Sequence, residues 1–386
     1  MASKQKWNQS IVWLALAVAT TSGNFATAHA QTRVATGQPA PTFEVDPAWP
    51  KIPNGWTLGQ VSSAVSDSKG NIWVLQRPRT VVHTGDKTGP PVLVFDQNGN
   101  YIKGWGGPGE GYDWPESEHG IYIDYKGFVW ICGDGPNDQV LKFTQEGKFV
   151  LQIGHGSPKK SNADTQQMWR PAGLSVYPKT NELFVSDGYG NKRVIVFDAD
   201  TGAFKRMWGA FGNKPLDGPL PKQKAYADPT RVMNKTLPAD DPGPSQFSTV
   251  HDVKVSNDGV VYVADRGGQR VQIFSVDGKY QTQIWIDRWC EEMGGCGNGQ
   301  TAGAVAFSPD PEQRFLYVMS RSASRVWVFD RKTLTPLEWL GSPGIGPGEF
   351  YGPHWVLTDP KGNIYVCEVL DGRRIHKFVL KGITTK

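Results

Sequence analysis

The stretch HDVKVSNDGVVYVADR, residues 251–266, reads as two short strands joined by a turn at Asn-Asp-Gly. Apolar residues alternate with polar ones before the turn, and valines and a tyrosine follow it, which is typical of a β-hairpin. Related hairpins begin at five other places in the chain, at Ser62, His119, Ala172, Gly303 and His354. Self-similarity of this kind indicates a repeat architecture.

A third and a fourth strand follow each hairpin. The third strands read VLVFD, VLKF, VIVFD, VQIF, VWVFD and IHKF. Six copies of a four-strand unit predict an all-β fold, a six-bladed β-propeller with a central channel. We expect a single domain over residues 31–386, with TFEVDPAW (42–49) supplying the strand that closes the ring. The glycine-rich joints GWGGPGEGYDWPES, LGSPGIGPGEFYGP and IGHGSP resemble those of NHL-type propeller repeats.

The composition agrees with many short strands. The chain contains 45 glycines, 28 prolines and 15 tryptophans, which favours strands and tight turns over helices. The formal net charge is only +4, and lysines and arginines are scattered along the chain. No basic stripe is present, so we expect no nucleic-acid partner.

Residues 1–30 have the features of an export signal. Lys4 and Lys6 precede an apolar stretch from Ile11 to Ala19, and Ala28-His29-Ala30 offers a cleavage site. The apolar stretch is too short to span a bilayer. We therefore expect an exported protein, periplasmic or secreted, that has no membrane span and is a monomer.

The four cysteines fall into two pairs. Cys290 and Cys296 bracket a glycine-rich loop, CEEMGGC, and we expect them to form a disulfide in an oxidising compartment, with a metal or a free-thiol role as the alternatives. Cys132 and Cys367 lie in the apolar strands VWIC and IYVC. These two are predicted to be buried packing thiols.

Three histidines share one position in the repeat. His119, His251 and His354 each lie eight residues before the turn glycine of their hairpin, in blades two, four and six. This position begins the innermost strand, so three imidazoles should converge on the channel. Three histidine ligands with a free fourth position are typical of catalytic zinc. Zinc is therefore the expected metal, although iron, copper and manganese accept the same ligands.

Arginines and a tyrosine end the second strands. Arg77 and Arg266 lie seven residues after the turn glycine, Arg321 takes the corresponding place in blade five, and Tyr189 lies one step further in blade three. The second strand runs antiparallel to the first, so these side chains should lie around the histidines. Paired arginines suit a small-molecule or peptide substrate that bears a carboxylate. A tyrosine beside a divalent cation can act as a base.

With these residues the chain resembles the peptidyl-α-hydroxyglycine α-amidating lyase family. The matching stretches are LGQVSSAV, HGIYIDYKGFVW, FVSDGYGNKRVIVF, VHDVKVSNDGVVYVADRGGQRVQIF and GPHWVLTDPKGNIYV. The resemblance implies a lyase that cleaves the C–N bond of an N-acyl-α-hydroxyglycine to give a primary amide and glyoxylate. It also implies zinc bound by three histidines, a catalytic tyrosine and two active-site arginines, at His119, His251, His354, Tyr189, Arg77 and Arg266.

The chain departs from the family at several positions. An aspartate after the third zinc histidine helps the family hold a calcium ion, but here that residue is Trp355, and Asp252 follows the second histidine instead. This makes calcium doubtful. Gly190 replaces the cysteine that follows the family's catalytic tyrosine, so the family's disulfides are not carried over. Arg321 has no counterpart in the family, and we expect no attached monooxygenase domain.

Two other functions remain open on the sequence alone. One is a metal-dependent hydrolase, such as a lactonase, that acts on a small hydroxy acid, and the other is an exported NHL module that binds a partner without catalysis. Loops 209–250 and 286–302 should wall a substrate pocket. His83, His155 and His376 are predicted to be surface residues.

Overall fold

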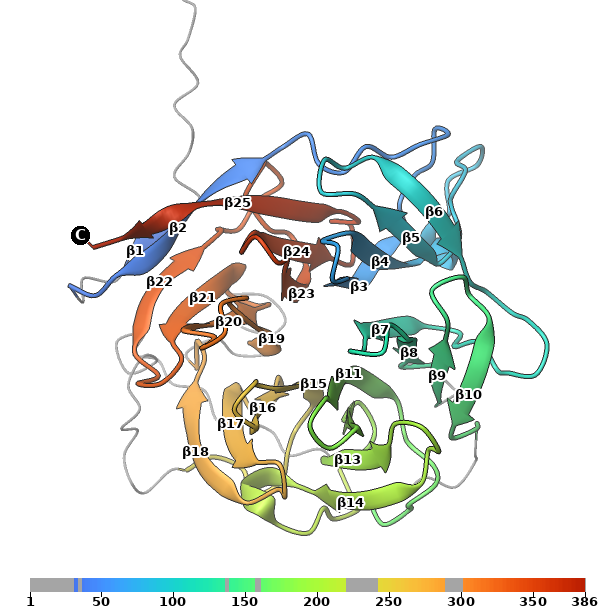
Figure 1. The fold of residues 1–386 in the computed structure, drawn as a ribbon, viewed down its shortest axis with the longest axis vertical. Coiled ribbons are helices and arrows are strands. Elements are labelled where there is room, and N and C mark those ends of the chain that lie inside the picture. The colour runs from blue at the N-terminus through green and yellow to red at the C-terminus, as the bar shows by residue number, and fades with distance from the viewer. Residues whose placement is uncertain are drawn as a thin grey trace, which may run out of the picture.

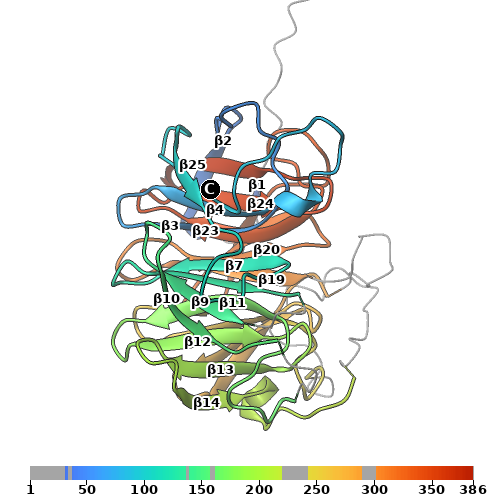
Figure 2. The same cartoon turned by 90° about the vertical axis from the view of Figure 1, so that its right-hand side faces the viewer.

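The computed structural model describes residues 31–33, 37–135, 139–156, 161–219, 242–288 and 301–385. Six antiparallel sheets are arranged around a central axis, which confirms the predicted six-bladed propeller (Figure 1). The ring is a flattened disc when it is viewed from the side (Figure 2). The only helices in the described residues are two short 3₁₀ turns, η1 (Pro78–Thr80) and η2 (Ala210–Gly212).

The first three blades follow one another along the chain, each beginning with its innermost strand. Blade one contains β3 (Gln60–Ser66), β4 (Ile72–Arg77), β5 (Val92–Phe95) and β6 (Tyr101–Trp105). Blade two contains β7 (Glu118–Ile123), β8 (Val129–Gly133), β9 (Val140–Phe143) and β10 (Phe149–Ile153). Blade three contains β11 (Pro171–Tyr177), β12 (Glu182–Asp187), β13 (Arg193–Asp198) and β14 (Phe204–Trp208).

The last three blades repeat this order, and two of them recruit a strand from the N-terminal part of the chain. Blade four contains β15 (Val250–Val255), β16 (Val260–Asp265), β17 (Arg270–Ser275) and β18 (Tyr280–Trp285). Blade five contains β19 (Ala302–Phe307), β20 (Phe315–Ser320), β21 (Arg325–Asp330), β22 (Pro336–Leu340) and the additional β1 (Gln31–Arg33). Blade six contains β23 (Pro353–Thr358), β24 (Ile364–Glu368), β25 (Ile375–Thr384) and β2 (Ala40–Asp46).

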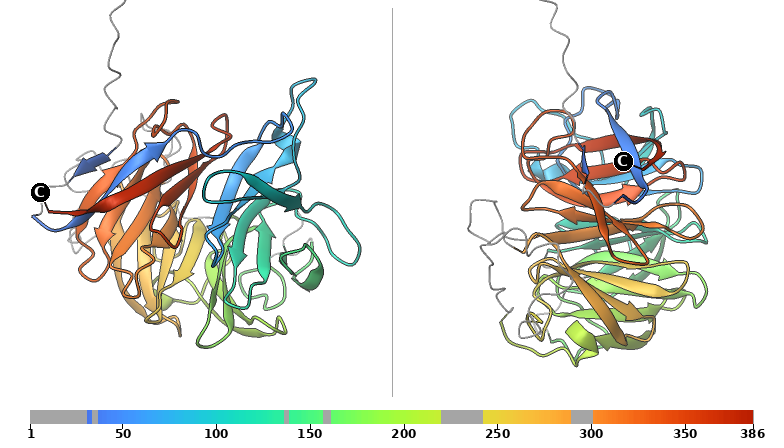
Figure 3. Two further views of the ribbon diagram at one scale, coloured as in Figure 1. Left: turned by 45° about the horizontal axis from the view of Figure 1, so that its top comes forward. Right: turned by 90° about the vertical axis from the view of Figure 1, so that its left-hand side faces the viewer.

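Blade six closes the ring by joining both ends of the described chain. The strand β2 pairs antiparallel with β25, so the blue and red strands lie side by side (Figures 1 and 3). The inner strand β23 also lies against β3 of blade one. The closing strand predicted within residues 42–49 is thus confirmed, although it begins at Ala40 and ends at Asp46. The pairing of β1 with β22 was not predicted.

Aspartate-containing turns join the first and second strands. In blade one, Asp67 Oδ1 accepts hydrogen bonds from the backbone N–H groups of Lys69 and Asn71, each at 2.9 Å. Its Oδ2 accepts a hydrogen bond from Trp73 Nε1 at 3.1 Å. Gly70 adopts a φ of 81°, a conformation that favours glycine. The hairpins of blades two, four and six have the same length as that of blade one, so a residue at the start of their inner strands keeps a constant offset from the turn glycine.

The inner strand of every blade carries a β-bulge near its start. In blade two, Glu118 pairs with Gly133 and Gly120 pairs with Cys132, so that His119 between them has no partner across the ladder. A bulge of this kind redirects a side chain away from the regular pleat. The residues at the bulge are Ser62, His119, Ala172, His251, Gly303 and His354.

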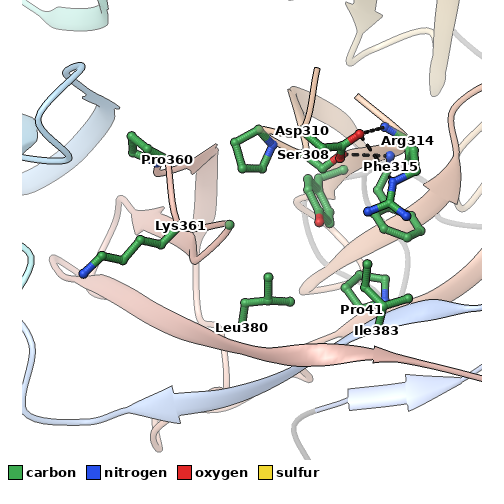
Figure 4. A pocket seen from close by; sticks show the side chains of 12 residues that line it. Pro41, Ser308, Asp310, Arg314, Phe315, Pro360, Lys361, Leu380 and Ile383 are labelled. Carbon is green, nitrogen blue, oxygen red and sulfur yellow. Dashed lines mark hydrogen bonds and ion pairs between the residues drawn. The ribbon is translucent and has the colours of Figure 1, made fainter. Parts of the chain in front are cut away.

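A pocket of about 260 Å³ lies between blades five and six (Figure 4). Asp310, Arg314, Phe315, Lys361 and Leu380 are among its lining residues. Most of them belong to the turns between first and second strands, at the opposite end of the blades from the histidines. This pocket is therefore separate from the candidate site. No helix in the described part of the chain is long and apolar enough to cross a membrane.

Candidate metal centre and active site

Three histidines from alternate blades meet between the inner strands. The ring centroids of His119 and His251 are 4.8 Å apart, and those of His119 and His354 are 4.7 Å apart. One nitrogen from each ring lies within 4.8 Å of the nitrogens of the other two. All three side chains are buried. The structure thus brings together the three residues whose common offset predicted a metal site.

A backbone carbonyl of the next blade orients each imidazole. The acceptor belongs in every case to the bulge residue of that blade, and the three contacts are His119 Nδ1 to Ala172 O at 2.8 Å, His251 Nδ1 to Gly303 O at 2.5 Å and His354 Nδ1 to Ser62 O at 2.6 Å. A carbonyl oxygen only accepts, so Nδ1 carries the proton and Nε2 keeps its lone pair in the neutral ring. Metal-binding histidines are typically held in this way.

Burial keeps the three imidazoles neutral. It lowers the pKa of His119 to about 3, although Asp134 opposes the shift, and Arg77 adds to it. Burial, followed by the charge of Arg266, holds the pKa of His251 well below its usual range. The pKa of His354 is also lowered, chiefly by burial. Three neutral nitrogen donors that face one another fit a zinc-type cation.

We expect the metal-free protein to lose stability as the pH falls below about 6.5, the pKa of an unperturbed imidazole. Unfolded histidines bind a proton in this range, whereas buried His119 stays neutral down to about pH 3. The unfolded state therefore takes up more protons, and the free energy of unfolding should fall by about 1.4 kcal/mol per pH unit for each histidine. Denaturant titrations between pH 8 and pH 5 measure the slope. A His119→Gln variant should have a shallower slope, and an unchanged slope would contradict this account.

Tyr189 lies against the histidine cluster. Its Oη is 3.0 Å from His119 Nε2 and 3.1 Å from His251 Nε2, and it accepts a hydrogen bond from Arg266 Nη1 at 3.0 Å. The guanidinium groups of Arg266 and Arg170 lie 4.9 Å and 5.1 Å from the centre of its ring. The hydroxyl has one proton, so it can donate to only one of the two nitrogens. The Nε2 atom that receives no proton from Tyr189 keeps its lone pair for a cation, which supports the fit of a metal at this point.

Arg77 is held by three groups at the edge of the site. Its Nε donates to Glu118 O at 2.7 Å, and its Nη1 donates to Gln60 Oε1 at 3.1 Å. Its Nη2 lies 3.6 Å from Asp134, which also pairs with Arg170 at 3.5 Å. Sequence reasoning missed Asp134 and Arg170. Asp134 lies seven residues after its turn glycine, as Arg77 does, and this offset could have revealed it.

The motif SDGYGNKR, residues 186–193, holds the loop that carries Tyr189. Asp187 Oδ2 accepts a hydrogen bond from Arg193 Nε at 2.8 Å, and both side chains are fully buried. Asp187 Oδ1 accepts from the backbone N–H of Trp169 at 2.8 Å. Trp169 lies so close to Gly190 that a Cβ on this glycine would be 2.3 Å from the indole. This contact accounts for the glycine that follows Tyr189.

Arg193→Met should destabilise the protein by about 3–5 kcal/mol, because it leaves a buried carboxylate without its partner. Arg193 also donates to the backbone oxygens of Asn162 and Gln167, so the loop before blade three should loosen as well. Chemical denaturation measures the loss. The control is Lys126→Met, which removes an exposed pair with Asp200 and should cost less than about 1 kcal/mol. Equal losses in the two variants would contradict the prediction.

Trp355, Asp252 and Lys254 fill the channel next to the histidines. The Trp355 indole lies 6.4 Å from the His119 ring and 6.0 Å from the His251 ring. Lys254 Nζ is 2.6 Å from Asp252 Oδ1 and 4.9 Å from the centre of the Trp355 ring. Burial raises the pKa of Asp252, and the ammonium of Lys254 opposes the shift. The carboxylate that follows the second histidine is thus already paired with a cation.

Several other sequence predictions can be compared with the structure. Cys132 and Cys367 are buried free thiols, as expected. His83 and His155 are exposed. His376 is buried, because its ring packs against Phe350 and lies 2.8 Å from Glu368 Oε2. The prediction that His376 is a surface residue was therefore wrong. The proposed signal (1–30), the proposed Cys290–Cys296 disulfide and much of the two predicted pocket loops lie outside the described residues.

Comparisons with known proteins agree with this fold. The NHL repeat family matches residues 247–274. NHL repeat-containing protein 3 of Mus musculus is 29% identical over 355 residues, covering 88% of this chain and 84% of that protein. Peptidyl-alpha-hydroxyglycine alpha-amidating lyase 1 of Drosophila melanogaster is 26% identical over 378 residues, covering 89% of this chain and 60% of that protein. These relatives confirm the resemblance to NHL propellers and amidating lyases that the motifs indicated.

A solved structure supports the fold independently. Virginiamycin B lyase from Staphylococcus aureus matches with a TM-score of 0.51 and 15% identity, covering 88% of this chain and 100% of that chain. At this identity the match bears on the propeller fold and not on the reaction.

Proposed function

We propose that this propeller is a metal-dependent lyase that cleaves the C–N bond of an N-acyl or peptidyl α-hydroxyglycine, releasing an amide and glyoxylate. The observation that carries the proposal is the position of the Tyr189 hydroxyl, between Arg266 and the Nε2 atoms of two inward-facing histidines. The relative named as an amidating lyase supports the same reaction class. A binding module would have no use for this arrangement of base, cation and metal ligands.

His119, His251 and His354 would hold the metal through Nε2. A bound zinc ion would act as a Lewis acid that polarises the hydroxyl and carboxylate oxygens of the substrate. Tyr189 Oη, when deprotonated, would take the proton of the substrate hydroxyl as the carbon–oxygen double bond of glyoxylate forms. The C–N bond breaks with its electron pair on nitrogen, and Tyr189 would return the proton to that nitrogen to give the primary amide.

Arg266 would fix the phenol oxygen in place and stabilise its negative charge through the 3.0 Å hydrogen bond from Nη1. The guanidinium of Arg170 on the tyrosine ring would add to this effect. Trp355 and Lys254 fill the neighbouring part of the channel, so the substrate would enter from the end that carries the arginines.

The test uses zinc-loaded protein and N-benzoyl-α-hydroxyglycine. We expect benzamide and glyoxylate in equal amounts, at a rate well above that without protein, with chromatography for benzamide and a colorimetric assay for glyoxylate. Zinc-loaded protein that forms neither product would overturn the proposal. Hydrolysis of a lactone in place of this cleavage would favour a metal-dependent hydrolase.

We also propose that the protein is exported, after removal of residues 1–30, as a single domain that acts as a monomer. The N-terminal segment Lys4 to Ala30 supports export. Amino-terminal sequencing of the protein from its native cells should begin near Gln31, and light scattering should give the mass of one chain. A mature protein that retains Met1 would overturn this part of the proposal.

A further inference from the structure

Arg321 occupies the same structural position as the two arginines already assigned to the site. It follows β20, one residue beyond the pair Ser320 and Ala302. Arg266 likewise follows β16, one residue beyond the pair Asp265 and Val250. These positions lie at the end of the blades where the histidines begin the inner strands. Arg321 therefore comes to the site from blade five, beside Arg266 of blade four.

The guanidinium groups of these three arginines differ in how many hydrogen bonds and ion pairs they form with the protein. Arg77 donates to Glu118 O and Gln60 Oε1 and lies 3.6 Å from Asp134, so it is fixed within the protein. Arg266 donates to Tyr189. By contrast, Arg321 Nε is buried without a hydrogen-bond partner, and no carboxylate in the described residues forms an ion pair with Arg321. Arg266 Nε also lacks a partner, but Arg266 Nη1 is bound to Tyr189, so of these three arginines only Arg321 has no side-chain hydrogen bond or ion pair within the described residues.

The surroundings of Arg321 are cationic. Burial lowers the pKa of Arg321 to about 10, and the charges of Arg266 and Arg77 add to the shift. Arg321 in turn helps to lower the pKa of His354, which shows that it lies near the histidine cluster. The site's carboxylate, Asp134, is paired with Arg77 and Arg170. A buried cation without a counter-charge is costly, and an anionic ligand would remove that cost.

We propose that Arg321 is the residue that anchors the carboxylate of the substrate. Arg77 acts instead as a positioning residue, because its partner Asp134 also pairs with Arg170. This rests on the proposed function and assigns a role to a residue that the resemblance leaves without one. A forked guanidinium binds the two oxygens of a carboxylate in one plane and distinguishes an α-hydroxy acid from its neutral amide. The substrate class is therefore an α-hydroxy acid with a free carboxylate, which should bind more tightly than the amide or ester of the same acid.

The experiment measures binding of mandelate and of its amide, mandelamide, to zinc-loaded protein by calorimetry. Both probes carry the α-hydroxyl, but neither contains the C–N bond that the lyase would cleave. Arg321→Met should weaken mandelate binding by about 100-fold, because it removes a buried charged partner, and mandelamide binding by less than about twofold. Arg321→Lys keeps the charge but loses the fork, so it should weaken mandelate binding by about tenfold.

The matched control is Arg314→Met, an arginine of the same blade that is half-exposed at the opposite end and pairs with Asp310. It should leave both affinities unchanged. Equal mandelate affinity in wild type and Arg321→Met would overturn the proposal, as would a parallel loss of acid and amide binding or a wild type that does not prefer the acid. If mandelate binds preferentially through Arg321 but the protein forms no glyoxylate, the proposed lyase activity is wrong and carboxylate binding by Arg321 is confirmed.

Discussion

His251→Ala is expected to remove the metal and to lower turnover of N-benzoyl-α-hydroxyglycine by at least about a thousandfold, because a three-nitrogen site cannot hold the ion with two. The substitution also removes the imidazole that donates to Gly303 O and accepts at Nε2 beside Tyr189. The metal content measured by elemental analysis should fall from about one equivalent per chain to near zero. The same result is expected for His119 and His354, since each supplies one of the three facing nitrogens.

The matched control is Ser62→Ala. Ser62 lies at the bulge of blade one, and its carbonyl oxygen, which this substitution keeps, accepts from His354 Nδ1. Metal content and turnover should therefore stay close to those of the wild type. A full equivalent of metal in His251→Ala would contradict the three-histidine site, and circular dichroism separates loss of the metal from loss of the fold.

Tyr189→Phe is expected to lower kcat by about 10²–10⁴, the range for removal of a general acid–base group, while the metal stays bound. The phenyl ring keeps the stacking between Arg170 and Arg266, so the loop should hold its position. Because the carboxylate contacts are unchanged, KM should change little, and steady-state kinetics with metal analysis tests both points.

Tyr125→Phe is the control for this substitution. Tyr125 is an exposed residue in the turn of blade two, and its hydroxyl donates to Asn181 far from the histidines. It should turn over substrate at the wild-type rate. A Tyr189→Phe variant with wild-type kcat would show that another group moves the proton.

The propeller and the cluster of three histidines could be predicted from sequence because the hairpins of blades one, two, four and six have equal lengths. The turn around Asp67 and Gly70 recurs in other blades, so a count from the turn glycine locates His119 and its two equivalents. The β-bulges could not be predicted in this way. The number of residues between a histidine and its turn glycine is the same whether or not the histidine pairs across the ladder. The carbonyl oxygens that orient the imidazoles belong to neighbouring blades, and no pattern of side chains reveals them.

The residues that sequence reasoning missed or misplaced depend on contacts between distant segments. Arg170 precedes blade three in a joint that shares no repeat pattern, yet it stacks on Tyr189. His376 has the alternation of an outer strand, but its ring packs against Phe350 and lies beside Glu368. Arg321, in contrast, lies at a repeated position that the sequence identified, and only its lack of partners in the structure suggests a role.

The pairing of β2 with β25 has a consequence for the biosynthesis of the protein. The ribosome makes residues 40–46 well before residues 375–384, so blade six cannot be completed until the whole propeller has been synthesised. That blade carries His354, the third of the facing histidines. Before that point at most two of the three histidines belong to finished blades. If the three histidines bind a metal as proposed, its capture is a late event that coincides with ring closure, in whichever compartment the finished chain folds.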